Sequence, residues 1–446
     1  MSLYQKNHPK IPHCTSTHDR KHFHRRFLII NTIYGIILVE KQDKGEMVMA
    51  KKTILDTELK GKKVIMRVDF NVPMKDGEIS DENRIVAALD SIRYILNQGG
   101  KLILLSHLGR VEKEEDKVGS SLAPVAKRLS EHLNQPVTFV PYTRGKEVEA
   151  AVSNLEEGQV MMLENTRFED IDGKKESKNN EELGQYWASL ADVFVNDAFG
   201  TAHRAHASNV GIANNIETSV AGFLLEREIK FIGDTIANPE RPLVAVLGGA
   251  KVSDKINVIK KLLEVADYVI ITGAMAYTFY LAQGYDVGLS KVEKDKVDLA
   301  LELLELAKGK IVLGTDVVTA KSFDPESERN IRLKSEIPSD EMGMDVGPET
   351  LKTYFSYIEK AKTVIWNGPL GVFEFPRFAE GTKGFAKKLV ELKDTVTTII
   401  GGGDSAAAVI QFGYEGEFAH ISTGGGASLE YLEGKLLPGI ACVDDK

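Results

Sequence analysis

The chain has 446 residues, with 65 acidic and 56 basic side chains and a formal net charge of −9 at pH 7. This length predicts two or three domains, and a hydrophobic fraction of 43% excludes a wholly disordered chain. The acidic balance argues against a nucleic-acid partner. The only two cysteines, Cys14 and Cys442, exclude a disulfide framework or a cysteine-based zinc site, so a reducing cytoplasm is the expected compartment.

The first 48 residues differ in composition from the rest of the chain. They carry eight Lys and Arg against four Asp and Glu, and they hold five of the ten histidines. The apolar run at 27–39 is shorter than the about 20 residues that a membrane span needs, and no small-residue cleavage site follows it. Because a patterned segment begins at Met49, we interpret residues 1–48 as a disordered or non-native leader and expect no membrane partner.

From residue 51 onward, short apolar strands alternate with amphipathic helices. In the first half we expect helices at 84–98 and 122–133 and strands at 64–66, 101–106, 137–140, 160–163 and 193–195. In the second half we expect helices at 255–266 and 296–307 and strands at 243–247, 268–271, 311–313, 363–366, 396–400 and 418–421. This alternation predicts an α/β chain with two doubly wound, parallel-sheet domains of the Rossmann type.

The boundary between the two domains falls at a predicted connecting helix. Residues 222–237 have an amphipathic helical pattern, and two prolines in the segment that follows stop the helix. We therefore expect a first domain at 49–221, a second at 238–430 and a C-terminal tail at 431–446. The charged segments 112–117 and 174–182 are expected to be surface loops.

Cationic residues follow or adjoin the predicted strands of the first half. They are Arg67, Arg84, Arg110, Arg167 and Arg204, with His107 and His203. A single arginine more often pairs with a nearby carboxylate, such as Asp69, Glu169 or Asp197. Five at the ligand-binding edge of an α/β sheet instead favour a small polyanion that carries both phosphate and carboxylate. Asp69 and Asn71 suit a hydroxyl group of that ligand.

The second half contains three glycine-rich triplets. The triplet at 248–250 is Gly-Gly-Ala, and those at 401–403 and 424–426 are Gly-Gly-Gly. Glycine lets backbone N–H groups approach a phosphate, and a helix N-terminus favours negative charge. Each triplet alone is as readily a tight turn. Three in one domain, with Lys251 and Lys255 after the first, favour a nucleotide.

Other nucleotide-binding proteins remain as alternatives. The chain has no P-loop, but Gly401, Gly403 and Ala406 fit the loose dinucleotide fingerprint of an NAD-dependent dehydrogenase. The acidic ribose ligand expected about 20 residues later is missing. Asp404 would repel a pyrophosphate unless Mg²⁺ lay between them, so Asp404 with Mg²⁺ and a nucleotide is the favoured interpretation. A non-catalytic nucleotide-binding module is a third possibility, which leaves the arginines without a role.

Residues 50–446 resemble the phosphoglycerate kinase family. In the first half the resemblance lies in RVDFNVP at 67–73, SHLGR at 106–110 and DAFGTAHRAH at 197–206. In the second half it lies in GGAKV at 248–252, WNGPLGVFE at 366–374 and GGGD at 401–404. The resemblance implies reversible, Mg²⁺-dependent phosphoryl transfer from 1,3-bisphosphoglycerate to ADP, giving ATP and 3-phosphoglycerate. It also implies a step of glycolysis, in a cytoplasmic and usually monomeric enzyme.

The resemblance also implies the site residues. Those for phosphoglycerate are Asp69, Phe70, Asn71, Arg84, His107, Leu108, Gly109, Arg110, Arg167 and Arg204. Those for the nucleotide are Lys255, Gly343, Glu374, Gly402, Gly403, Asp404 and Ser405. Glu374 would meet the ribose and Asp404 the Mg²⁺. Arg84, Lys251 and Lys255 would stabilise the transferring phosphoryl group, and domain closure would bring the two ligands together.

Overall fold

The computed structural model describes residues 28–32, 35–39 and 50–446, and the chain divides into compact units at 1–48 and 49–446. In the first unit, β1 (Leu28–Thr32) and β2 (Gly35–Val39) form an antiparallel pair. The prediction of an unstructured leader missed this pair, although a run rich in isoleucine and valine favours strands. For the other residues of 1–48, the prediction of an unstructured leader lies outside the residues that the structure describes. No helix among the described residues is long and apolar enough to cross a membrane.

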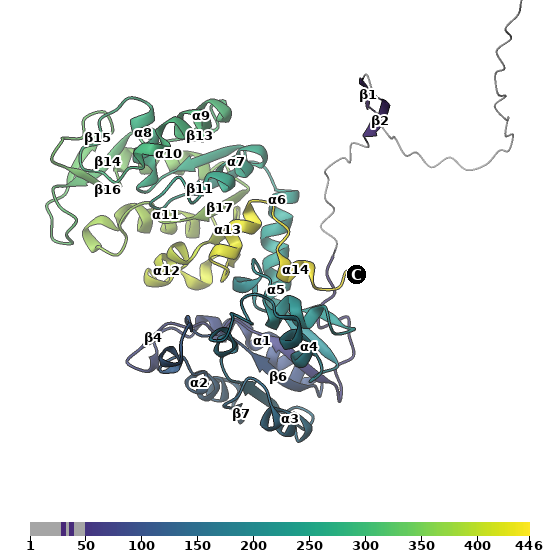
Figure 1. Cartoon of the computed structure of the whole chain (residues 1–446). Coiled ribbons are helices and arrows are strands. Elements are labelled where there is room, and N and C mark those ends of the chain that lie inside the picture. The colour runs from purple at the N-terminus through teal and green to yellow at the C-terminus, as the bar shows by residue number, and fades with distance from the viewer. Residues whose placement is uncertain (1–27, 33–34, 40–49) are drawn as a thin grey trace, which may run out of the picture. The chain divides into compact units, whose positions relative to one another are not determined.

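The first lobe is built on a parallel sheet to which β6 and β7 belong (Figure 1). The sheet has six strands in the order β10-β9-β3-β6-β8-β7. Its strands are β3 (Lys63–Arg67), β6 (Lys101–Leu105), β7 (Val137–Val140), β8 (Val160–Leu163), β9 (Val193–Asn196) and β10 (Ser219–Ala221). Its helices are α1 (Asn83–Asn97), α2 (Ala123–Leu133), α3 (Lys146–Ser153) and α4 (Glu181–Ala188). A small hairpin joins β4 (Met74–Lys75) and β5 (Glu78–Ile79).

Apolar cores cover both faces of this sheet. Along β3, Val64 and Met66 belong to one buried cluster and Ile65 to another. Successive side chains of a strand point to opposite faces, so each face has its own core. This two-sided burial explains why the strands read as continuous apolar runs in the sequence.

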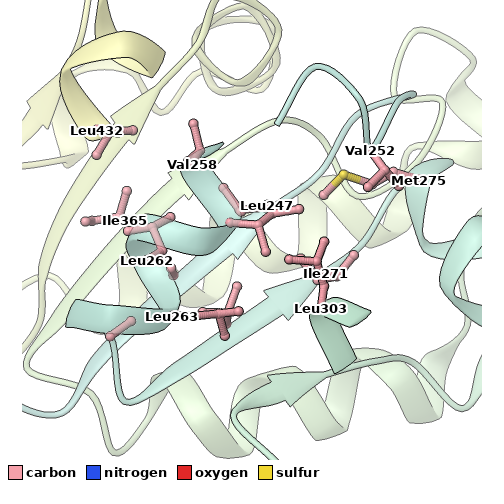
Figure 2. Packing of buried hydrophobic residues seen from close by; sticks show 14 of the residues in the cluster. Leu247, Val252, Val258, Leu262, Leu263, Ile271, Met275, Leu303, Ile365 and Leu432 are labelled. Atoms are coloured by element: carbon pink, nitrogen blue, oxygen red, sulfur yellow. The ribbon is translucent and has the colours of Figure 1, made fainter. Parts of the chain in front are cut away.

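The second lobe has a parallel six-stranded sheet ordered β13-β12-β11-β17-β18-β19. Its strands are β11 (Leu243–Leu247), β12 (Tyr268–Ile271), β13 (Ile311–Val312), β17 (Thr363–Asn367), β18 (Thr397–Gly401) and β19 (His420–Ile421). Its helices are α7 (Ile256–Val265), α8 (Met275–Ala282), α9 (Val297–Ala307), α10 (Pro348–Ile358), α11 (Glu380–Glu391), α12 (Gly403–Gln411) and α13 (Gly426–Leu432). Figure 2 shows part of one core, in which Leu247 of the sheet lies near Leu262 of α7 and Ile271 of the sheet lies near Leu303 of α9. The two sheets confirm the predicted α/β class.

A three-stranded antiparallel sheet in the second lobe was not predicted. It is ordered β15-β14-β16 and consists of β14 (Asp316–Ala320), β15 (Asn330–Leu333) and β16 (Met342–Val346). These strands interrupt the strand–helix alternation, and β15 alternates between half-buried and exposed residues, so no continuous apolar run marks it. The sheet supplies one wall of the cavity described below.

A continuous helical run connects the lobes. It begins as α5 (Phe223–Glu228), passes through the π-helical turn η5 (Ile229–Asp234) and ends as α6 (Thr235–Ala237). The sequence predicted one helix here but not the π turn. After α13 the chain returns to the first lobe through α14 (Pro438–Ala441), where the amide of Gly439 donates to the carbonyl of Ala202 (Figure 1). The domain boundaries given above stay a prediction.

Candidate active site

Four neighbouring strands of the first lobe deliver polar residues to one edge of the sheet. In the order β9, β3, β6 and β8, these strands are parallel, so the loops after them lie side by side. The loops begin at Asp197, Val68, Ser106 and Glu164. The sheet topology therefore explains why the predicted phosphoglycerate residues, which are far apart in the chain, lie close together.

Hydrogen bonds link these loops to one another. The side-chain oxygen of Asn71 accepts from the amide of Gly109 at 2.8 Å, and Nη1 of Arg167 donates to the Gly109 carbonyl at 2.8 Å. Asn165 adds a third link, because its Oδ1 accepts from the amide of Leu108 at 3.2 Å. The loops after β3, β6 and β8 are thus held in one fixed arrangement.

Arg84 enters this site from the first turn of α1. Its Nη1 lies 2.6 Å from Oδ2 of Asp69, while a third of its side chain stays exposed. Phe70 and Leu108 contribute differently, because their side chains are buried in the apolar core. Any contact that Phe70 or Leu108 makes with a ligand would therefore involve main-chain atoms.

Of the five predicted arginines, Arg84 pairs with Asp69 as described above, and the other four separate into two groups. Arg110, Arg167 and Arg204 form no salt bridge with any residue in 50–446, and Arg110 and Arg204 are exposed. Arg67 is instead wholly buried, with Nη1 3.6 Å from the carboxylate of Glu176. Arg67 therefore lies behind the binding surface rather than on it.

The partner of Arg67 also corrects a prediction about the charged segment 174–182. This segment was expected to be a surface loop, yet the side chain of Glu176 has no exposed surface. Charge composition alone did not reveal that one of its carboxylates turns inward.

Burial and neighbouring charges favour the neutral forms of the histidines at this site. Burial, followed by the charges of neighbouring arginines, holds the pKa of His107 well below its usual range. The same causes lower the pKa of His206 to about 3, and burial also lowers that of His203. The positive charge of the site is therefore carried mainly by its arginines.

A cavity of about 260 Å³ lies in the second lobe. It is formed beyond the carboxyl ends of β11, β12, β17 and β18 and beside β16. Of the predicted nucleotide residues, Gly343, Glu374 and Asp404 line it. Tyr277 and Leu370 provide apolar and aromatic surface, which suits the flat ring of a base.

Two glycines in this lobe meet clear steric requirements. A Cβ atom on Gly343 would lie 1.7 Å from the hydroxyl of Tyr277, so only glycine fits there. Gly402 has a φ of +86°, which glycine adopts readily, and it immediately precedes α12. Gly403 and Asp404 then form the first turn of that helix, whose N-terminus favours an anion.

Lys255 is buried at the edge of β17. Its ammonium group donates to the carbonyl and the side-chain oxygen of Asn367, with a distance of 3.0 Å to the carbonyl. Burial lowers the pKa of Lys255 to about 8, although the charge of Asp404 opposes this shift. Lys251 is exposed, and the hydroxyl of Ser405 accepts from the amide of Gly368 at 2.5 Å.

The third glycine triplet does not line the cavity. Gly424 is next to Phe199 of the first lobe, where an added Cβ would lie 2.4 Å from the ring, and Gly426 is near His203. The amide of Thr423, before this triplet, donates to Glu228 at 2.8 Å. Like the second triplet, it contributes no residue to the lining of the cavity, and its phosphate-binding role stays a prediction.

Sequence reasoning gave no role to Asn367. Besides accepting from Lys255, it places an unpartnered, buried Nδ2 near Gly402, where an added Cβ would lie 3.1 Å away. Such a donor suits a phosphate oxygen. Its position directly at the end of a buried strand was a signal that could have identified it.

Known proteins match this arrangement along almost the whole second unit. A family model described as phosphoglycerate kinase matches residues 54–435. The phosphoglycerate kinase of Enterococcus faecalis is 64% identical over 398 residues, which is 89% of this chain and 100% of the relative. That of Staphylococcus aureus (strain bovine RF122 / ET3-1) is 60% identical over the same shares of both chains.

Solved structures agree. The phosphoglycerate kinase of Coxiella burnetii has a TM-score of 0.79 at 39% identity, covering 88% of this chain and 98% of that one. The enzyme of Pyrococcus horikoshii OT3 has a TM-score of 0.76 at 32% identity, with the same coverage.

Proposed function

The chain belongs to the phosphoglycerate kinase family, and on this basis we propose how its two lobes divide the substrates. The enzyme is a phosphotransferase of glycolysis that converts 1,3-bisphosphoglycerate and ADP into 3-phosphoglycerate and ATP, and the reverse. In our proposal the first lobe binds the phosphoglycerate and the second binds the nucleotide. A dehydrogenase is not favoured.

The observation that carries this assignment is the set of arginines without carboxylate partners. Arg110, Arg167 and Arg204 form no salt bridge among residues 50–446 and lie in the loops beside Asn71 and His107. Arginine binds carboxylate and phosphate with paired hydrogen bonds, so these residues suit both ends of phosphoglycerate. Calorimetric titration of 3-phosphoglycerate into an Arg167→Ala and Arg204→Ala double variant tests it. Unchanged affinity would contradict the assignment.

The nucleotide assignment is supported by the cavity beside Gly343, Glu374 and Asp404. Its apolar wall suits the base, the exposed carboxylate of Glu374 suits ribose hydroxyls, and Gly402 and Gly403 offer backbone N–H groups to phosphates.

We propose that Asp404 holds Mg²⁺ together with the nucleotide phosphates. Asp404 lines the cavity, is exposed and forms no salt bridge in the part of the chain from 50 to 446, and a single carboxylate plus phosphates is a usual ligand set for Mg²⁺. Bound there, Mg²⁺ would neutralise part of the phosphate charge. Lys251 and Lys255 would supply further positive charge.

Catalysis in this proposal consists of positioning and charge stabilisation. The acyl phosphate of the substrate is already activated, so no covalent enzyme intermediate is required. Because the ligands bind different lobes, closure about the helical run 223–237 would bring them together and exclude water. We further propose that the enzyme acts as a monomer in the cytoplasm, since one chain supplies both sites and its two cysteines fit a reducing compartment.

The nucleotide affinity is expected to depend on the protonation of Lys255. Because burial lowers its pKa to about 8, the ammonium loses its charge as the pH rises through that value. The kcat/KM for ADP should therefore fall above pH 8 in the wild-type enzyme. A Lys255→Arg variant stays charged, so this decline should be absent from its pH profile. A decline of equal size and midpoint in both proteins would contradict the prediction.

Residues 1–48 are expected to be dispensable. The chain divides between Val48 and Met49 into two compact units. The start of the second unit is fixed by its own C-terminus, because the amide of Lys446 donates to the carbonyl of Ala50 at 2.7 Å. A chain that begins at Met49 should match the full chain in melting temperature and turnover. A decrease of several degrees would show that the leader contributes to stability.

A further inference from the structure

A buried carboxylate lies directly behind the phosphoglycerate site. Glu176 has no exposed surface, and its Oε1 and Oε2 accept from the hydroxyl and the amide of Ser208 at 2.5 and 3.0 Å. Its Oε1 also lies 3.6 Å from Nη1 of Arg67 and 3.7 Å from Nδ1 of His206. Glu176 is not exposed to any ligand, so its role must be exerted through these neighbours.

Arg67 links Glu176 to His107. Its Nη1 donates to the hydroxyl of Thr166 at 3.1 Å, and its Nη2 lies 3.0 Å from Nδ1 of His107. A guanidinium group has only donors, so Nδ1 of His107 must be the acceptor and carry no proton. The imidazole of His107 is then neutral, with its proton on Nε2.

The other imidazole nitrogen is left for a ligand. Nε2 of His107 forms no hydrogen bond with any residue in 50–446, whereas Nδ1 is engaged by Arg67. We propose that Glu176 is a positioning residue, which holds Arg67 against His107 and thereby fixes His107 as the Nε2–H tautomer, ready to donate to the phosphoglycerate.

The surroundings of His107 support a neutral donor rather than a cation. The charged and titratable groups that act on it are Arg67, Arg84, Arg167, His206 and Asp69. Three of them are permanent cations, so a proton on both ring nitrogens is opposed. Without a fixed partner on Nδ1, a neutral imidazole would distribute its proton between its two nitrogens.

The inference rests on the proposed function for the placement of the phosphoglycerate, but its first test needs no ligand. The tautomer of His107 is read from the ¹⁵N shifts of its ring in the full-length, ligand-free enzyme at pH 7, with the signal assigned by its loss in His107→Ala. In the wild type a single Nε2–H form is expected. In Glu176→Gln, where Arg67 loses its counter-charge, we expect a mixture of both tautomers.

Steady-state kinetics should also reveal this role, because a mixture of tautomers leaves fewer His107 side chains with Nε2–H aligned to donate to the phosphoglycerate. In Glu176→Gln the KM for 3-phosphoglycerate should rise about tenfold, while the KM for ATP stays unchanged and kcat changes less than twofold. Glu169→Gln is the matched control, because Glu169 is also buried and pairs with Arg144 at 3.0 Å. It contacts neither Arg67 nor His107, so Glu169→Gln should keep the wild-type tautomer and KM.

A second variant decides the question if Glu176→Gln does not fold. Arg67→Lys keeps a positive charge beside Glu176, but its side chain ends in one nitrogen, which cannot occupy the positions of both Nη1, 3.1 Å from Thr166, and Nη2, 3.0 Å from His107. It should reproduce the mixed tautomers and the raised KM. A single Nε2–H tautomer in the folded variant, or a KM equal to that of Glu169→Gln, would overturn the inference. An unchanged KM in His107→Ala would instead contradict the proposed phosphoglycerate site.

Discussion

Replacing Arg84 with alanine is expected to lower kcat by about 10²–10³ while leaving the affinity for 3-phosphoglycerate nearly unchanged. Arg84 is fixed by its 2.6 Å contact with Asp69 at the start of α1, yet a third of its side chain is free to meet a ligand. Arg110, Arg167 and Arg204 would still hold the anionic groups of the substrate. A cation directed at charge that is redistributed only during transfer contributes mainly to the transition state.

Steady-state kinetics on the folded variant measure this effect, and Arg93→Ala is the matched control. Arg93 lies near the other end of α1, where its Nη2 donates to the carbonyl of His132 at 3.0 Å. Its removal should change kcat less than twofold. A raised KM with an intact kcat in Arg84→Ala would leave Arg84 as a uniform binding residue and remove it from the catalytic set.

The sequence predicts most of the two parallel sheets because their strands are buried on both faces. Strands β7, β8, β11 and β12 have the predicted bounds, and most of the others differ by one or two residues at an end. Such strands are continuous apolar runs, and this signal is independent of the rest of the fold. The antiparallel sheet β15-β14-β16 lacks it, since β15 is only half-buried. Its position depends on tertiary contacts that a local pattern does not record.

The chemistry of the site is predictable where the sheet alone determines it. Residues in the loops that follow parallel strands, such as Asn71, His107 and Arg167, come together because neighbouring strands end at one edge. The same rule wrongly assigned Arg67 to the ligand-binding surface. Arg67 is the last residue of β3, a strand that is buried on both faces, so its side chain is packed in the interior. A residue within a strand buried on both faces therefore supports the site, whereas residues in the loop after the strand can reach a ligand.

Residues whose position depends on contacts between distant loops are not predicted by this rule. Glu176 lies in a charged run with no periodicity, and only the packing of that loop against Ser208 and Arg67 buries it. The third glycine triplet has the same local sequence signal as the second. It faces the first lobe because the chain returns there after α13, as the Gly439–Ala202 contact shows. Both placements arise from long-range contacts.

Replacing Asp404 with alanine is expected to lower kcat/KM for Mg-ATP by at least about 100-fold, with little change in phosphoglycerate binding. Asp404 is an exposed carboxylate in the first turn of α12, and it lines the second-lobe cavity. A carboxylate there is unfavourable beside bare phosphates. We expect Asp404 to be favourable because Mg²⁺ lies between its carboxylate and the phosphates. Loss of the carboxylate should therefore raise the Mg²⁺ concentration that gives half the maximal rate.

Calorimetric titrations separate this role from a general loss of structure. ADP should bind Asp404→Ala much more weakly than the wild type when Mg²⁺ is present, and the two proteins should differ far less when Mg²⁺ is removed by a chelator. Asp394→Ala is the matched control, because Asp394 is an exposed carboxylate near the opposite end of β18 and should leave both titrations unchanged.

Equal losses of phosphoglycerate and ADP affinity in Asp404→Ala, or a loss of phosphoglycerate affinity alone, would contradict the assignment of one ligand to each lobe. A loss of ADP affinity that is the same with and without Mg²⁺ would keep the nucleotide at this cavity but remove the metal from Asp404.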